Sequence, residues 1–228
     1  MSSRQEEKEQ RKQERLEREA KAAKAAKRKR LLQLIGGVIV AGAVVAGIAF
    51  AVSSAGNGTS ESAGGADVDT GRLTSAASDA GCVYRAFPNE GEEHTAEPLT
   101  AEDFETNPPT SGTHNPNPAP DGLYVTGNEP AIENWVHTLE HGRVLFQYKP
   151  GTDEAVVSQL EALFNEDVAG SGGGYHSVLM QNNTDMPFEV AAVAWRHYMA
   201  CETFTPRTIE ALRVFRDELV DKGPETVP

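Results

Sequence analysis

Basic residues are scarce in this chain once its first 30 residues are set aside. The 228 residues carry 21 Lys and Arg against 34 Asp and Glu, and twelve of the basic residues stand in residues 1–30 beside six Glu. That arm therefore has a net charge of +6, whereas the other 198 residues have a net charge of −19. Nucleic-acid binding needs a positive face, so the acidic body argues against a nucleic acid as partner. A basic arm on an acidic body indicates two compartments.

Large aliphatic side chains are nearly absent from residues 1–30 and from residues 53–80. Leu16 is the single one in the first segment, and Leu73 is the single one in the second apart from Val68. Segments of this composition cannot bury enough apolar surface to fold alone. We therefore expect a basic cytoplasmic arm over the first segment and a flexible linker over the second.

Charged side chains are missing altogether from residues 31–52, where Gln33 is the one strongly polar residue. About 20 apolar residues suffice to cross a bilayer, so this segment predicts a transmembrane helix. The basic residues before it place the N-terminus in the cytoplasm and residues 53–228 outside the cell membrane. A cleaved signal peptide is the competing interpretation because Ala49-Phe50-Ala51 fits a cleavage pattern, but the apolar run exceeds a usual signal core.

This single-pass topology makes the membrane a partner of the chain. The basic residues 27–30 suit anionic lipid. Small residues at four-residue spacing, such as Gly37 and Ala41, can pack two spans together and would allow a homodimer. A module held outside in this way could also contact another protein of the envelope.

Two common catalytic motifs are also missing. The glycines of residues 170–174 are followed by Tyr175, whereas a phosphate-binding loop needs Lys and then Ser or Thr. Ser111 has Pro109 where the G-x-S-x-G elbow of hydrolases has its first glycine. The hydroxyls of Thr110 and Ser111 are therefore expected to bond to backbone in a turn.

Residues 81–228 are long enough for one hydrophobic core. Apolar runs and helical spacing predict a strand, a helix, two strands and a last helix in that order. The predicted strands are 144–148, 177–180 and 188–195, and the helices follow the capping residues Thr152 and Thr205. This order favours an α+β domain with a small, largely antiparallel sheet and two packed helices.

Four of the six histidines stand within 48 residues: His94, His114, His137 and His141. Imidazole is the commonest metal ligand in proteins and serves both zinc and copper. A proline-rich loop holds His114 stiffly, as a ligand requires, and Glu140 could be a further ligand or could orient an imidazole. The alternative is that these histidines bond to loop carbonyls and to Glu140, which would make the domain an interaction or structural module without a metal.

The same segment contains H-x-x-E-H, the signature of inverted zinc peptidases, at residues 137–141. On a helix both histidines would share a face and bind zinc, and Glu140 would activate water as the catalytic residue. A third ligand could come from the acidic residues of the last helix: Glu210, Asp217 or Glu218. Gly142 follows at once, however, so the helix would be short, and a metal site without catalysis is favoured.

Cysteine is limited to Cys82 and Cys201, an even count on the acidic side of the chain. In an oxidising compartment they could pair. A strand over 195–201 would instead bring His197, Met199 and Cys201 to one side, and His with Met suits copper.

The motifs PPTSG-x-H at 108–114 and H-x-x-EHG at 137–142, with the ending FRDELVDKGPE, resemble a bacterial family common in actinobacteria. That family is known only as a domain of unknown function in membrane-anchored proteins, and the similarity spans roughly Ala80 to Glu225. It implies an extracytoplasmic module but no activity. Its members carry cysteines near the positions of Cys82 and Cys201, which supports the disulfide.

Overall fold

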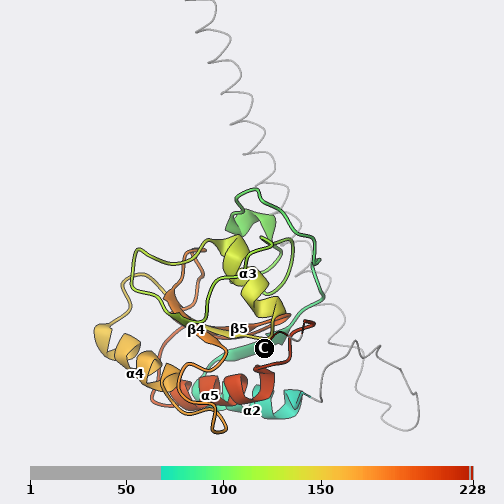
Figure 1. Ribbon diagram of the computed structural model, residues 1–228. Helices are drawn as coiled ribbons and strands as arrows, with labels where there is room; N and C mark the ends of the chain where they lie inside the picture. Colours follow the sequence, from blue (N-terminus) through green and yellow to red (C-terminus); the bar gives the residue numbers. More distant parts are fainter. Residues whose placement is uncertain (1–67, 226, 228) are drawn as a thin grey trace, which may run out of the picture. The chain divides into compact units, whose positions relative to one another are not determined.

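A six-stranded mixed sheet forms the centre of the residues that the computed structural model describes, which are 68–225 and 227 (Figure 1). The predicted cytoplasmic arm, the predicted transmembrane helix over 31–52 and most of the predicted linker lie outside these residues. Within the described part of the chain, none of the helices combines the length and apolar character that a bilayer crossing demands.

The strand order is β1-β6-β5-β3-β4-β2. The strands are β1 (Val83–Ala86), β2 (Gly122–Leu123), β3 (Val144–Tyr148), β4 (Ser177–Gln181), β5 (Val190–Ala194) and β6 (His197–Cys201). The pairs β1–β6, β6–β5 and β5–β3 are antiparallel, while β3–β4 and β4–β2 are parallel. The α+β class is confirmed, but the sheet is mixed rather than largely antiparallel. The helix between β3 and β4 is a crossover, which makes those strands parallel.

Helices cover both faces of the sheet (Figure 1). The four are α2 (Thr70–Ala80), α3 (Ile132–Glu140), α4 (Glu154–Phe164) and α5 (Thr208–Leu219), and a short 3-10 turn, η1, spans Ala101–Asp103. Helices α2, α4 and α5 pack on one face, and α3 packs on the other. Strand β3 shows why both faces are covered. Phe146 packs in the core beneath α2, α4 and α5, and its neighbour Leu145 packs in the core beneath α3. Both faces are buried, which explains the continuous apolar run of this strand.

Helix α2 occupies residues that the sequence analysis assigned to the flexible linker, so the linker prediction is wrong for residues 70–80. Asp69 caps the helix by accepting a hydrogen bond from the backbone of Arg72, and Gly81 ends it in the left-handed conformation. Leu73 and Ala77 are buried against α5 and the sheet. One leucine and two alanines are enough to hold this helix, because they pack against a core that the sheet and α5 already form.

The disulfide Cys82–Cys201 is confirmed and joins the chain after α2 to the end of β6. Cys201 is therefore not available as a ligand. Met199 is fully buried in the core, and His197 is paired through Nδ1 with the Tyr84 hydroxyl at 2.9 Å. The copper site suggested for β6 is therefore wrong.

Candidate metal centre

Helix α3 places three polar side chains at one end of its buried face. His137 and Glu140 lie in its last turn, and His141 is the residue that caps it. Residues three and four apart share a helix face, so all three point to the same side. Gly142 then turns the chain with φ of +78°, a conformation that favours glycine, and β3 begins two residues later.

Two extended segments bring the other histidines to this helix. The segment carrying His94 runs beside the one carrying His114. His114 donates its backbone N–H to Glu93 at 3.0 Å, and its carbonyl accepts from Thr95 at 2.7 Å. The preceding turn is buried, and Ser111 accepts through its Oγ the backbone N–H of the Glu90 segment at 3.0 Å. Ser111 therefore ties its loop to a segment 21 residues earlier, and Thr110 contacts the hydroxyl of Thr106 at 3.4 Å, whereas the expected role was a bond to backbone within the turn itself.

Together these elements form what we call the inner cluster, consisting of His94, His114, His137 and Glu140. One ligand atom from each lies within 4.8 Å of the others. Glu140 Oε2 is 2.9 Å from His114 Nε2 and 4.0 Å from His137 Nε2. Three members are buried and His94 is exposed, so the cluster is a mostly buried group with one side at the surface.

The tautomers of two histidines follow from their neighbours. His114 Nδ1 is 2.8 Å from the Gly112 carbonyl oxygen, and His137 Nδ1 is 2.5 Å from that of Asn115. A carbonyl oxygen only accepts, so both Nδ1 atoms carry the proton and donate it. Both Nε2 lone pairs then face the cluster, as in metal sites where a second contact orients the ligand.

Two buried atoms of the inner cluster lack a hydrogen-bond partner among the described residues. They are His114 Nε2 and Glu140 Oε2, whose 2.9 Å separation does not have hydrogen-bond geometry. Leaving a buried polar atom without a partner costs about 1–3 kcal/mol. The site therefore holds acceptors that a cation between them would satisfy.

Burial also sets the charge states of the inner cluster. Desolvation, with the negative charges of Glu225 and Glu92, raises the pKa of Glu140 from 4.5 to about 7. Desolvation lowers the pKa of His114, partly offset by its bond to Gly112. Both shifts favour the neutral forms, as burial does for ionisable groups.

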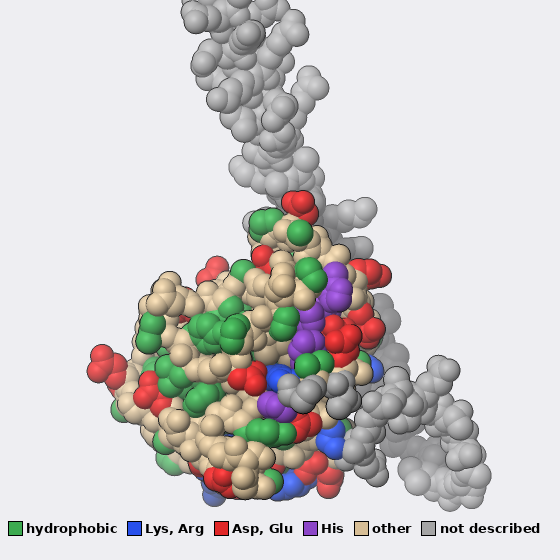
Figure 2. All heavy atoms as spheres, in the orientation of Figure 1, with side chains coloured by type: hydrophobic (Ala, Val, Ile, Leu, Met, Phe, Trp, Pro, Cys, Tyr) green, Lys and Arg blue, Asp and Glu red, His purple; other side chains and the backbone are tan. Residues whose placement is uncertain are grey.

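A second group, which we call the outer cluster, consists of His137, His141 and Glu225. His141 Nε2 is 2.9 Å from His137 Nε2 and 3.3 Å from Glu225 Oε2. Burial, and then His137, lowers the pKa of His141. Glu225 reaches the site because its backbone N–H donates to the carbonyl of Glu140 at 3.1 Å. In the space-filling view, histidine side chains form a row at the surface bordered by acidic ones (Figure 2).

The five residues predicted as ligands all lie in these two clusters, but His141 is grouped with Glu225 and meets the inner cluster only through His137. The sequence analysis missed Glu225, which no motif marks as a ligand although it stands in the C-terminal segment that supported the family resemblance. The acidic residues suggested as third ligands on α5 are on the other face of the sheet and form ion pairs there: Glu210 with Arg213, Asp217 with Arg216 and Glu218 with Arg72.

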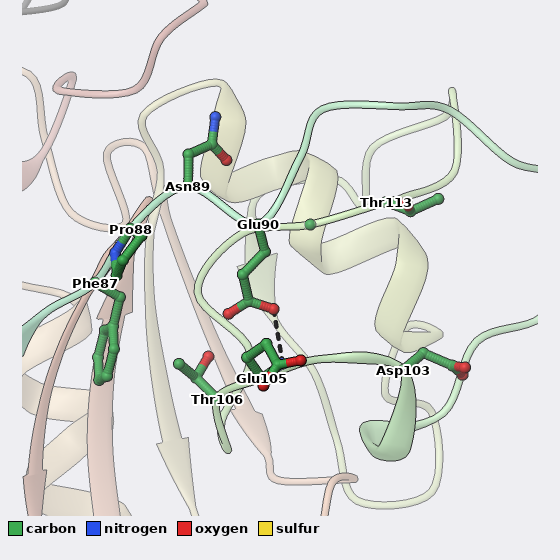
Figure 3. A pocket seen from close by; sticks show the side chains of 9 residues that line it. Phe87, Pro88, Asn89, Glu90, Asp103, Glu105, Thr106 and Thr113 are labelled. Atoms are coloured by element: carbon green, nitrogen blue, oxygen red, sulfur yellow. Dashed lines mark hydrogen bonds between the residues drawn. The ribbon is translucent and has the colours of Figure 1, made fainter.

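A separate pocket of about 430 Å³ lies beside the loop of His114 (Figure 3). Gly112 and Thr113 form part of its wall, and Glu90 extends from the facing segment. Burial raises the pKa of Glu90, whose Oε2 accepts the backbone N–H of Glu105 at 2.7 Å. The pocket and the inner cluster share the loop that carries His114, but none of the four residues of the inner cluster lines the pocket.

Comparison with known proteins adds a family but no activity. The model of a family described as "Protein of unknown function (DUF3105)" matches residues 96–227. This range contains every residue of the two clusters except His94. No curated protein and no solved structure matches the chain.

Proposed function

The chain belongs to the DUF3105 family, and we propose that its α+β domain binds one transition-metal ion, zinc or copper, through the inner cluster. The observation that supports this is the convergence of three imidazoles and one carboxylate, two of whose buried atoms lack any hydrogen-bond partner among the described residues. The loop-bracing alternative is supported by the Nδ1 bonds of His114 and His137 to the carbonyls of Gly112 and Asn115, but these bonds leave both Nε2 atoms directed at the cluster.

The geometry of the inner cluster fits one ion after a small contraction. Zinc ligands lie about 2.0–2.2 Å from the metal, so two of them are at most about 4.4 Å apart. The inner cluster spans 4.8 Å at most, and exposed His94 can move closer. Imidazole nitrogen with carboxylate oxygen is a ligand set suited to zinc and to copper in its oxidised state.

The proposed setting is the outer side of the cell membrane, with the chain anchored by one span and its N-terminus in the cytoplasm. This rests on the uncharged residues 31–52 and the basic residues before them. The disulfide supports it, since such bonds persist in oxidising compartments. A metal-binding domain in this position would serve metal handling in the envelope.

Metal counting tests the proposal. Full-length protein in detergent is stripped with a chelator, dialysed against zinc or copper, and its metal content is measured by mass spectrometry. We expect about one equivalent for the parent and under a tenth of that for His114→Ala and His137→Ala, because removing a ligand from such a site costs orders of magnitude in affinity. His176→Ala, outside both clusters, is the control. A parent protein that retains no metal would refute the proposal.

A zinc hydrolase is the second candidate, because the outer cluster supplies the third ligand that H-x-x-E-H requires. Its metal would be held by His137, His141 and Glu225, with Glu140 as the base. The carboxylate of Glu140 is only 4% exposed and lies against His114, however, rather than toward an open position for water. The variant Glu140→Gln separates the two functions: a base can be lost with the metal retained, whereas loss of a ligand lowers metal content.

A further inference from the structure

His137 belongs to both clusters, but only one of its ring nitrogens can bind a metal ion. Its Nδ1 donates to the Asn115 carbonyl at 2.5 Å, which leaves the Nε2 lone pair as its single ligand position. That atom is 2.9 Å from His141 Nε2 and 4.0 Å from Glu140 Oε2. One lone pair binds one ion, so the two clusters cannot each hold a metal through His137 at the same time.

The two clusters differ in their access to solvent. In the outer cluster the side chain of Glu225 is 51% exposed and that of His141 is 12% exposed. In the inner cluster the side chains of His114 and Glu140 are 0% and 4% exposed. An ion arriving from solvent therefore meets a reachable carboxylate and imidazole first, and a buried set behind them.

The outer cluster is held in place by backbone rather than by chance contact of a free tail. Asp221 donates its N–H to the carbonyl of Gly142 at 2.8 Å, and Glu225 donates to that of Glu140 at 3.1 Å. Between them Gly223 approaches the end of α3 so closely that a Cβ there would stand 2.2 Å from the Glu140 carbonyl oxygen. The tail is thus clamped to the helix whose side chains make up most of both clusters.

From the shared nitrogen, the difference in exposure and the clamped tail, we propose that the outer cluster is a loading site, from which His137 passes a metal ion to the inner cluster. This rests on the proposed function. An ion binds first to His141 and Glu225 with His137. It then moves to Glu140, His114 and His94 while His137 remains bound, and leaves the outer residues free. The competing route is direct entry of the ion into the inner cluster past the exposed ring of His94.

The rate of loading tests this route in the full-length protein. Cu²⁺ is mixed with stripped protein in a stopped-flow instrument, and binding is followed by quenching of tryptophan fluorescence, since the Trp195 ring is 6.1 Å from that of His114. We expect His141→Ala and Glu225→Gln to slow loading about ten-fold, the size of effect that a focusing charge has on association. Release should slow equally, because a step on the path affects both directions, so the dissociation constant and the stoichiometry of one ion stay as in the parent.

The controls separate the possible failures. Glu202→Gln changes an exposed carboxylate after the far end of β6 and should load at the parental rate. Glu225→Gln alters a half-exposed side chain, so its folding is not in question. Parental loading rates in both outer-cluster variants, two bound ions, or a loss of affinity in His141→Ala as large as in His114→Ala would each overturn the loading site while leaving metal binding intact. No metal in the parent would overturn the proposed function itself, and the loading site with it.

Discussion

Replacing Glu140 by Gln removes the buried carboxyl of the inner cluster while keeping its shape, and it should change how the stability of the metal-free protein depends on pH. In the folded chain the pKa of Glu140 is raised from 4.5 to about 7. Between these values the folded state holds a proton that the unfolded chain has released, so the stabilisation is complete below about pH 4.5 and is lost as pH rises through about 7. The difference corresponds to at most about 3 kcal/mol. Gln carries no charge, so the variant should lack this decline.

The assay is urea unfolding between pH 4.5 and 8 with a chelator present, followed by the fluorescence of buried Trp135 and Trp195. The lowered pKa of His114 gives a trend of opposite sign. Because His114 Nε2 lies 2.9 Å from Glu140 Oε2, the difference between the two curves reports the ionisation of Glu140 together with its effect on His114. Excess zinc should abolish the decline in the parent, because a bound ion replaces the proton on Glu140. Parallel curves for parent and variant without metal would show that Glu140 ionises in the fold at its ordinary pH, and the argument from burial would fail.

Three further predictions concern the frame of the site and its location. Replacing Cys82 and Cys201 by Ser opens a loop with a sequence separation of 119 and should lower the free energy of unfolding by up to about 4–5 kcal/mol on the chain-entropy model; an unchanged urea midpoint would contradict it. Gly142→Ala should destabilise by more than about 1 kcal/mol, because it strains a positive φ and brings a Cβ to 2.9 Å from the Asp221 Cα; equal melting temperatures would count against this. A C-terminal tag should be cleaved by protease added to intact spheroplasts and a tag at residue 2 protected, if residues 31–52 span the membrane.

The sequence was most informative where a pattern is local. The strand over Val144–Tyr148 was predicted with its observed bounds, because an apolar run short enough for a strand and flanked by turn residues has few alternatives. The parallel pairing of this strand with β4 was not predicted, since pairing is decided by where the crossover helix packs. Helix α2 was missed because Leu73 is its only large buried side chain, and its stability comes from α5, more than a hundred residues away.

The candidate site divides along the same line. Imidazoles on a rigid loop and at a helix end were recognisable from residue type and spacing, so a shared site for His114 and His137 could be predicted from the sequence. Gly142 indicated a short helix, but the assignment of His141 to a separate group with Glu225 was not foreseeable, because it depends on where the C-terminal segment packs. Glu225 could not be recognised at all, since a backbone clamp between Asp221 and Gly142 brings it there and no residue type announces such a clamp.

The bond between Cys82 and Cys201 closes a covalent ring around the four histidines of both clusters and leaves only Glu225 outside it. A protease that cuts one exposed loop within this ring produces a nicked molecule, not two fragments. All four imidazoles then stay on one covalent body, and the nick becomes visible only after a reductant is added. In a compartment where proteases are met more often than reductants, the ring protects the ligand set against the commoner kind of damage.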